Sequence, residues 1–206
     1  MPLDMVDTCL CMGAGLNIAQ GVEKVEPDTT CFAFVGDSTF FASAITGVVN
    51  AVYNQANMVL VVLDNSTTAM TGHQPHPGTG RTVMGEIVQK INTEQVLRGI
   101  GVTEIETINP LELEASVSCV KRMAEKSGVR AIIFKAPCIA VTKPKAPLHV
   151  DQDSCIGCKK CIRDLGWPAI VMNDGKICID ASMCTGCHLC SQVCPVCAIA
   201  GGDDHE

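Results

Sequence analysis

Short apolar runs alternate with amphipathic stretches from Cys9 to about Ala140. Four of these runs have the length and composition of strands. They lie at residues 31–35, 58–63, 102–107 and 129–135. The small apolar residues between 39 and 55 recur with helical spacing. Strands that alternate with helices predict an α/β domain with a mostly parallel sheet.

Two further helices are predicted from the residues that open them. Asn92 begins a capping pattern and predicts a helix over residues 92–98. Asn109 and Pro110 predict another helix, with Asn109 as its cap and Pro110 as its first helical residue, running to about Lys126.

The chain changes character at residues 143–149, which contain two prolines, two lysines and no periodic pattern. We expect a linker at this place. It would separate a first domain at residues 1–142 from a second domain at residues 150–200. The polar residues 201–206 are expected to form a disordered tail.

Composition and charge narrow the classes of function. Hydrophobic residues make up 47% and charged residues 18% of the chain, which is typical of a packed domain rather than a disordered segment. The net charge of −7 argues against nucleic acid as a partner. No apolar run approaches the roughly 18 residues of a membrane span. No secretion signal is recognisable, so we expect a cytoplasmic protein with no membrane partner.

The second domain contains an internal repeat. The pattern Val150-Asp-x-x-x-Cys155-x-Gly-Cys-x-x-Cys161 returns 29 positions later as Ile179-Asp-x-x-x-Cys184-x-Gly-Cys-x-x-Cys190. Two copies of one short unit predict a module with approximate twofold symmetry.

Cysteine is concentrated in this module. The chain has 14 cysteines, and nine of them fall between Cys155 and Cys197. The run Cys184-x2-Cys187-x2-Cys190-x3-Cys194-Pro favours iron–sulfur clusters, and the fourth cysteine of such a run typically binds the other cluster of a pair. The alternative is a zinc site, which usually takes two Cys-x2-Cys pairs.

Oxygen-bearing side chains follow two of the predicted strands. Gly36, Asp37 and Ser38 come after the first strand, and Asn65 and Thr67 come after the second. Ligands of open α/β sheets bind beyond the carboxyl ends of the strands. A carboxylate with an amide oxygen there suits Mg²⁺ shared with a phosphate group. The alternative is two ordinary turns, because Gly-Asp and Asp-Asn are common turn dipeptides.

Two loops are further candidates. Gly13-Ala-Gly15 lacks the third glycine of a dinucleotide fingerprint, so we reject that interpretation and expect the small residues to admit a ligand close to the backbone. The loop at 71–78 holds His73 and His76 among glycines and prolines. A long polar loop is typical of a functional or a disordered segment. Each histidine is a candidate to touch substrate, and the alternative is a solvated loop residue.

The chain resembles a known family over nearly its whole length. The segments Asp7-Thr-Cys9-Leu-Cys11-Met-Gly13-Ala, Gly36-Asp-Ser-Thr-Phe-Phe41, Leu63-Asp-Asn65-x-Thr-Thr-Ala-Met-Thr-Gly-His-Gln-Pro-His-Pro-Gly78 and the cysteine-rich repeat carry the resemblance. In this order they are similar to the alpha subunit of indolepyruvate ferredoxin oxidoreductases. The implied fold is a thiamine diphosphate-binding α/β domain followed by a small α+β ferredoxin domain with two clusters.

The resemblance also implies roles for single residues. Asp37 and Asn65 would bind Mg²⁺ through their side chains, and Thr67 would bind it through its backbone carbonyl. Independently of the resemblance, His73 of the loop at 71–78 is taken as the candidate catalytic residue. The residues that would touch the thiamine diphosphate, with the first three at its rings, are Cys11, Met12, Gly13, Gly36, Asp37, Ser38, Asn65 and Thr67.

The implied function is that of a component of a 2-oxoacid:ferredoxin oxidoreductase. It would oxidatively decarboxylate an arylpyruvate such as indolepyruvate to an aryl-acetyl-CoA with coenzyme A, and pass electrons through its clusters to an external ferredoxin. A beta subunit would be a further partner. Two alternatives stay open, namely another 2-oxoacid such as pyruvate or 2-oxoglutarate, and an electron-transfer protein whose thiamine domain is inactive.

The sequence departs from the family pattern in its domain content. Family alpha subunits carry a pyrimidine-binding domain, whose glutamate activates the cofactor. That domain is missing from this sequence. We therefore expect a truncated fragment or one part of a split subunit, inactive without a pyrimidine-binding partner.

A second departure lies in the repeat. Cys155, Cys158, Cys161 and Cys194 would hold one [4Fe–4S] cluster. The other cluster has only Cys184, Cys187 and Cys190, because Leu165 stands opposite Cys194 and Trp167 stands before Pro168. This second cluster is expected to be [3Fe–4S], or [4Fe–4S] with Cys178 or Cys197 as its fourth ligand.

Overall fold

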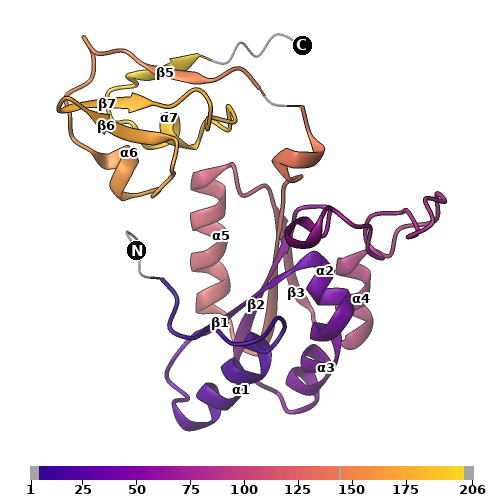
Figure 1. The fold of residues 1–206 in the computed structure, drawn as a ribbon. Coiled ribbons are helices and arrows are strands. Elements are labelled where there is room, and N and C mark those ends of the chain that lie inside the picture. Colours follow the sequence, from indigo (N-terminus) through magenta and orange to yellow (C-terminus); the bar gives the residue numbers. More distant parts are fainter. Residues whose placement is uncertain (1–4, 144, 202–206) are drawn as a thin grey trace. The chain divides into compact units, whose positions relative to one another are not determined.

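The structure is a computed structural model that describes residues 5–143 and 145–201. The chain divides into two compact units, which are described separately here (Figure 1). The first unit is Thr8–Val141. The second begins at Thr142 and also takes in the described residues before Thr8.

The first unit is built on a four-stranded sheet with the order β1-β2-β4-β3. All three strand pairings are parallel, which confirms the predicted sheet. Gly36 lies opposite Leu63, so the carboxyl ends of β1 and β2 are side by side. The strands are β1 (Cys31–Gly36), β2 (Met58–Asp64), β3 (Glu104–Ile108) and β4 (Val129–Lys135).

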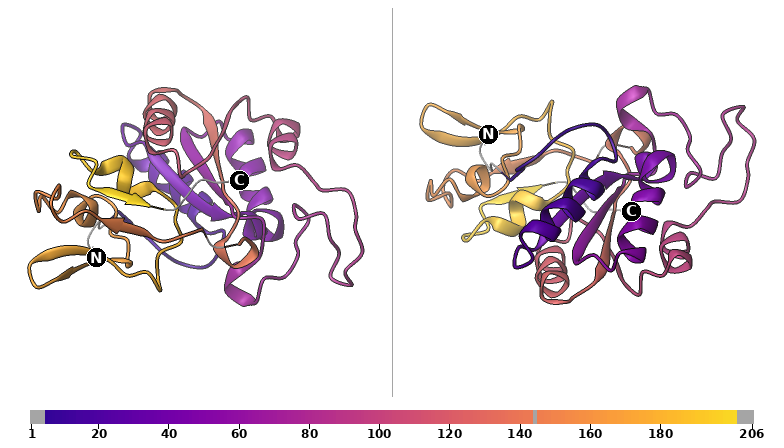
Figure 2. Two further views of the ribbon diagram at one scale, coloured as in Figure 1. Left: turned by 90° about the horizontal axis from the view of Figure 1, so that it is seen from above. Right: turned by 90° about the horizontal axis from the view of Figure 1, so that it is seen from below.

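Helices cover both faces of this sheet (Figures 1 and 2). The longer helices are α1 (Gly15–Val25), α3 (Ile45–Tyr53), α4 (Thr93–Ile100) and α5 (Leu113–Glu125). The short ones are α2 (Asp37–Thr39), the π-helical η1 (Phe40–Ala44) and the 3₁₀ turns η2 (Ala69–Thr71) and η3 (Ile139–Val141). Within the described part of the chain, no helix has the length and apolar character needed to cross a membrane.

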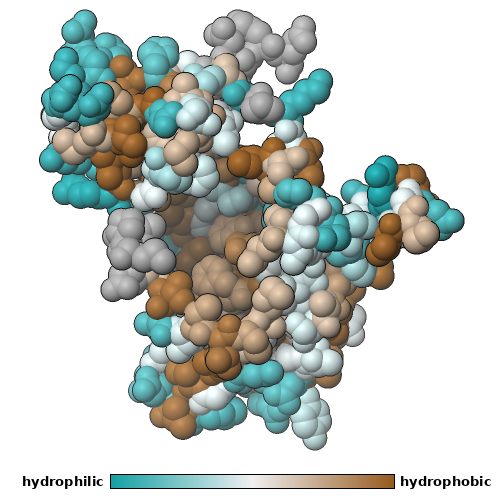
Figure 3. Space-filling model, in the orientation of Figure 1, coloured by the Kyte–Doolittle hydropathy of each residue, from teal (hydrophilic) through white to brown (hydrophobic). Residues whose placement is uncertain are grey.

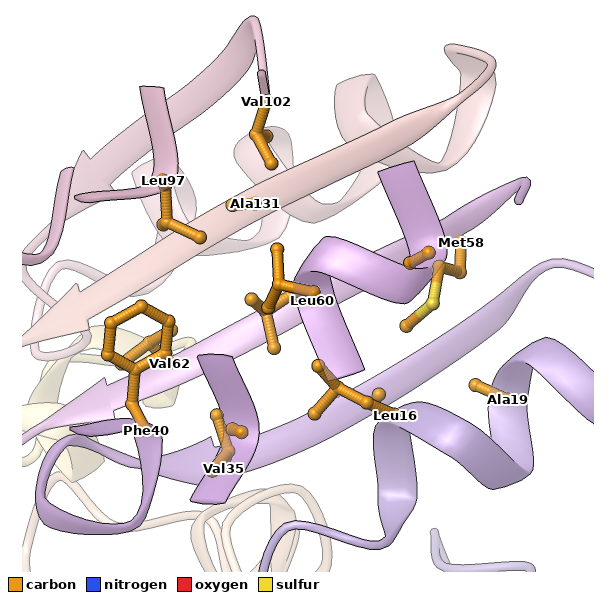
Figure 4. Packing of buried hydrophobic residues seen from close by; sticks show 14 of the residues in the cluster. Leu16, Ala19, Val35, Phe40, Met58, Leu60, Val62, Leu97, Val102 and Ala131 are labelled. Atoms are coloured by element: carbon orange, nitrogen blue, oxygen red, sulfur yellow. The ribbon is translucent and has the colours of Figure 1, made fainter. Parts of the chain in front are cut away.

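The central strand β2 is buried on both faces, because side chains alternate along a strand. Met58, Leu60 and Val62 pack with α1, α3 and α4 in the larger core (Figure 4). Val59 and Val61 face the other way and pack against Cys119 and Met123 of α5, among others. This two-sided core supports the ends of β1 and β2, where the oxygen-bearing residues lie.

The helix signals had different outcomes. The Asn92 cap is confirmed, because its Oδ1 accepts a hydrogen bond from the backbone N–H of Gln95 at 3.1 Å. The helix start at Pro110 is wrong. Asn109 Oδ1 instead accepts from the backbone N–H of Leu111 at 3.0 Å, and this turn delays the helix until Leu113.

The second unit is a small α+β module. Strand β5 (Leu148–Val150) pairs antiparallel with β8 (Ile199–Gly201), and β6 (Ile170–Asn173) pairs antiparallel with β7 (Lys176–Ile179). Its helices are α6 (Lys160–Arg163) and α7 (Leu189–Val193). The predicted linker therefore ends before Leu148. Gly201 belongs to a strand rather than to the tail, and residues 202–206 lie outside the described part of the chain.

The sequence repeat is also a structural repeat. Shifting by 29 positions carries β5 onto β7, β6 onto β8 and α6 onto α7. Gly157 and Gly186 are equivalent, and both have a φ of +66°, a conformation that favours glycine. Since β5 pairs with β8 and β6 with β7, each sheet joins one strand from each copy.

Candidate functional site

Asp37 is held at the point where β1 ends and the next helix begins. Its side chain is buried, and the residue is only 3% exposed. Oδ1 accepts a hydrogen bond from the backbone N–H of Ser38, and Oδ2 accepts one from the backbone N–H of Ser66, both at 2.8 Å. The structure thus brings Asp37 against the loop that follows β2.

That loop carries Asn65 and Thr67. Asn65 Oδ1 accepts from the backbone N–H of Thr67 at 3.1 Å and closes a small turn. The backbone carbonyl of Asn65 accepts from the N–H of Cys138 at 2.9 Å, which ties the loop to the segment after β4. An amide oxygen has two lone pairs, so Asn65 Oδ1 keeps one for a cation.

The histidine beside Asp37 is His76, whereas the histidine predicted to be catalytic is His73 of the same loop. His76 is buried, and its Nε2 lies 3.1 Å from Asp37 Oδ2. Its Nδ1 accepts from the backbone N–H of Gly78 at 3.2 Å, so the neutral ring carries its proton on Nε2 and donates it to Asp37. The ring also stacks on Phe41, with centroids 5.9 Å apart. His73 is exposed, with a φ of +63°.

The electrostatics of Asp37 favour a cation beside it. Burial raises the pKa of this carboxyl above its usual value, and the neighbouring Asp64 acts in the same direction. The Ser38 N–H, His76 and the Ser66 N–H lower the pKa in part. A divalent ion would stabilise the charged form that burial disfavours. With the amide oxygen of Asn65 and the carbonyl of Thr67 on the adjacent turn, the donor set fits Mg²⁺.

The loop at residues 11–13 packs on the helix that Asp37 begins. Ser43 Oγ donates to the backbone carbonyl of Met12 at 3.4 Å, and Met12 Sδ lies 3.8 Å from Thr39 Oγ1. Gly13 has a φ of +88°, and a Cβ on it would come 2.5 Å from Ser43 Oγ. Met12 and Cys11 are exposed, so they are available to a ligand that sits above Asp37.

In the second unit, cysteines line two hollows. The Cys155 hollow is lined by Cys155, Cys158, Cys161 and Cys194 together with apolar side chains such as Ile177. The Cys184 hollow is lined by Cys184, Cys187 and Cys190, again among apolar side chains. Their cavity volumes are about 20 and 50 Å³, and a cavity that holds one water molecule has roughly 10–15 Å³ by this measure.

Each hollow is lined by residues from both copies of the repeat. Cys194 belongs to the second copy and lines the Cys155 hollow. Its counterpart Leu165 belongs to the first copy and lines the Cys184 hollow, beside Trp167. Only one of the two hollows therefore has a cysteine contributed by the other copy.

Two thiols of the hollows have raised pKa values. Burial, together with the neighbouring Cys187 and Cys184, raises the pKa of Cys190 to about 11, and burial also raises that of Cys161. Bound iron offsets this cost, because it stabilises thiolates. Among the described residues no three ligating side chains converge on a single ion. A cubane does not need such convergence, since its thiolates bind different irons.

Residues 2–134 match the model of the thiamine pyrophosphate enzyme family, C-terminal TPP binding domain. The chain belongs to this family. It is 38% identical over 200 residues to the indolepyruvate oxidoreductase subunit IorA of Archaeoglobus fulgidus, covering 94% of this chain and 32% of that protein. It is 40% identical over 200 residues to IorA of Methanothermobacter thermautotrophicus, covering 96% of this chain and 32% of that protein. The chain thus spans about a third of the length of these relatives.

A solved structure shares the fold. The 2-oxoglutarate:ferredoxin oxidoreductase from Magnetococcus marinus, with 2-oxoglutarate, coenzyme A and succinyl-CoA bound, matches with a TM-score of 0.56 at 19% identity. The match covers 64% of this chain and 47% of that one. The resemblance to indolepyruvate oxidoreductase alpha subunits and the predicted α/β fold are both confirmed.

The thiamine pyrophosphate-binding domain gathers most of the predicted cofactor residues at one edge of its sheet. Asp37, Asn65 and Thr67 lie on adjacent turns, and the loop at 11–13 contacts the helix after Asp37. A Cβ on Gly36 would meet nothing within 4 Å, so space is open beside the strand end. The predicted catalytic residue His73 makes none of these contacts, whereas His76 does. No signal in the sequence distinguishes the two histidines.

Proposed function

We propose that the chain is a component of a thiamine diphosphate-dependent 2-oxoacid:ferredoxin oxidoreductase that acts on an arylpyruvate such as indolepyruvate. The observation that carries the proposal is the buried Asp37, paired with the Asn65–Thr67 turn in a thiamine pyrophosphate-binding domain. The name of the IorA relatives supports the substrate class.

The residues of the first unit would divide the work of holding the cofactor. Asp37, Asn65 and Thr67 supply the oxygens for Mg²⁺, which in turn holds the diphosphate. His76 donates to Asp37 and fixes the orientation of its carboxylate, as an outer partner of a metal ligand does. Bound thiamine diphosphate supplies the carbanion and the electron sink for decarboxylation of the 2-oxoacid.

The cysteines of the second unit give the same chain a means to carry electrons. Cys155, Cys158, Cys161 and Cys194 line one hollow and would hold one iron–sulfur cluster. Cys184, Cys187 and Cys190 line the other and would hold a second. An external ferredoxin would be the acceptor and coenzyme A would take the acyl group. A chain with both kinds of site fits an oxidoreductase better than a simple decarboxylase, which has no need of one-electron carriers.

Exposed apolar side chains support the need for partner domains. Met12 lies beside the site, and the loop that projects at the right of Figure 3 exposes Val83, Met84 and Ile87. Apolar residues gathered on a surface mark interaction sites. We expect a pyrimidine-binding domain or subunit, and a beta subunit, to be required for turnover.

The test replaces Asp37 with alanine. The affinity for thiamine diphosphate in the presence of Mg²⁺, measured by calorimetry on the assembled complex, should fall at least about 100-fold, because even an outer partner of a metal ligand typically contributes 10–100-fold. Iron content should stay unchanged, since Asp37 and the cysteines lie in different units. The exposed Asp28→Ala is the matched control.

Two outcomes would contradict the proposal. Unchanged cofactor affinity in Asp37→Ala would remove Asp37 from the binding site. Release of iron but no thiamine diphosphate on acid denaturation of the complex would favour an electron-transfer protein with an inactive thiamine domain. Turnover of the complex with indolepyruvate, pyruvate and 2-oxoglutarate in parallel then identifies the 2-oxoacid.

A further inference from the structure

The two hollows of the second unit are related by the repeat but differ in their ligands. The Cys155 hollow has four cysteines, the fourth being Cys194 from the other copy. The Cys184 hollow has three cysteines. Its other lining residues carry no thiol, carboxylate or imidazole, and they are Leu148, Leu165, Trp167, Ala169, Ile170, Ile179, Thr185 and Leu189.

The two spare cysteines nearby do not replace the missing thiolate. Ile177 and Ile179 of β7 each line a hollow, and Cys178 stands between them on the strand. Because successive side chains of a strand point to opposite faces, Cys178 points away from both hollows. Cys197 is exposed and lines neither hollow.

We propose that the Cys184 hollow holds a three-thiolate [3Fe–4S] cluster, next to a four-thiolate [4Fe–4S] cluster in the Cys155 hollow. This rests on the proposed function in one respect, namely that the second unit binds iron–sulfur clusters at all. The corner of a cubane that would meet a fourth cysteine meets Leu165 and Trp167 instead. An iron at that corner has no protein thiolate to retain it.

Space is not what prevents a fourth ligand. The Cys184 hollow has a cavity volume of about 50 Å³, against about 20 Å³ for the Cys155 hollow. Leu165 is half-buried and Trp167 is exposed, so a smaller side chain is accommodated at either position without opening the main core of the unit. A cysteine placed there by mutation should therefore restore the missing ligand.

The asymmetry also affects the electron affinity of the clusters. A three-iron cluster on three thiolates and a four-iron cluster on four thiolates differ in cluster type, which is among the factors that set a cluster's reduction potential. The cluster in the Cys184 hollow should therefore have a reduction potential different from that of the cluster in the Cys155 hollow. An electron that passes through the unit would then meet two clusters of different reduction potential.

The experiment counts iron and records EPR spectra of the full chain, purified and reconstituted without oxygen. We expect about seven irons per chain, four plus three, with the EPR signal of an oxidised three-iron cluster. Leu165→Cys or Trp167→Cys should raise the count to about eight and abolish that signal. Leu165→Ser, which shortens the same side chain without adding a thiol, should leave both unchanged.

Two further variants separate the possible failures. Cys194→Ser should convert the other hollow to three thiolates and lower the count to about six. A variant in which Cys178, Cys197 and His188 are all replaced should keep about seven irons. His188 is included because its Nε2 is buried and unpaired. Eight irons with two ordinary four-iron signals in the unmodified chain would overturn this inference but leave the proposed function intact. A chain that binds no iron would overturn both.

Discussion

The two units of this chain are stabilised by different means. The first buries strands and helices in two cores, one on each face of its sheet, so that β2 is enclosed on both faces. The second has only strands of three or four residues and helices of four or five. Many of its apolar side chains line two cysteine-lined hollows. From this difference we predict that the first unit folds by apolar burial, whereas the folding of the second depends on the iron–sulfur clusters proposed for it.

The largest expected effect follows from removing iron. Anaerobic chelation should unfold the second unit entirely, because a small metal-binding module gains its folding free energy from the metal. Hydrogen exchange of β5, β6, β7 and β8 should become fast, while that of β2 and β4 stays slow. Slow exchange in the second unit after complete loss of iron would contradict the prediction that this unit needs iron to fold.

The next effect concerns the core of the first unit. Leu60→Ala should lower its free energy of unfolding by about 2–5 kcal/mol, because Leu60 is 1% exposed and its loss leaves a cavity. Leu63→Ala on the same strand is the matched control, since Leu63 is 45% exposed and should change stability by about 0.5 kcal/mol or less. Equal effects of the two in denaturant titrations would contradict the assignment of this core.

The smallest effect concerns the positioning of Asp37. His76→Ala should weaken Mg²⁺-dependent cofactor binding about 10–100-fold, because Asp37 loses an orienting donor. His73→Ala, in the same loop but exposed, should leave that affinity unchanged. Calorimetry on the assembled complex measures both. If His73→Ala weakened binding and His76→Ala did not, the contact between His76 and Asp37 would have no functional role.

The strands of the first unit were the easiest elements to predict. Residues 129–135 are a strand as predicted, since they hold a short apolar run of strand length. Helix α1 at Gly15–Val25 was not predicted. It contains two glycines, and its buried face includes Gln20 and Glu23, which weaken the apolar pattern. The hydrogen bond of Gln20 Nε2 to the carbonyl of Gly47 comes from tertiary packing that the sequence does not display.

At the candidate site, too, the sequence predicts some of the arrangement but not the part that depends on tertiary packing. The positions of Asp37 and Asn65 after consecutive parallel strands were enough to expect that the two would meet at one sheet edge. The choice between His73 and His76 was not predictable, because both occupy one loop and only its folded path buries His76. The helix start at Pro110 failed because Asn109 caps a turn as readily as a helix.

The strand pairing of the cysteine-rich repeat bears on the history of the chain. A single copy cut out of it would hold two strands, and neither would have its partner, since β5 needs β8 and β6 needs β7. Two identical copies on separate chains would satisfy each other in full. The strand pairing is the one that two such copies would make in a symmetric dimer. The two copies are not equivalent, because Leu165 of the first stands where the second has Cys194.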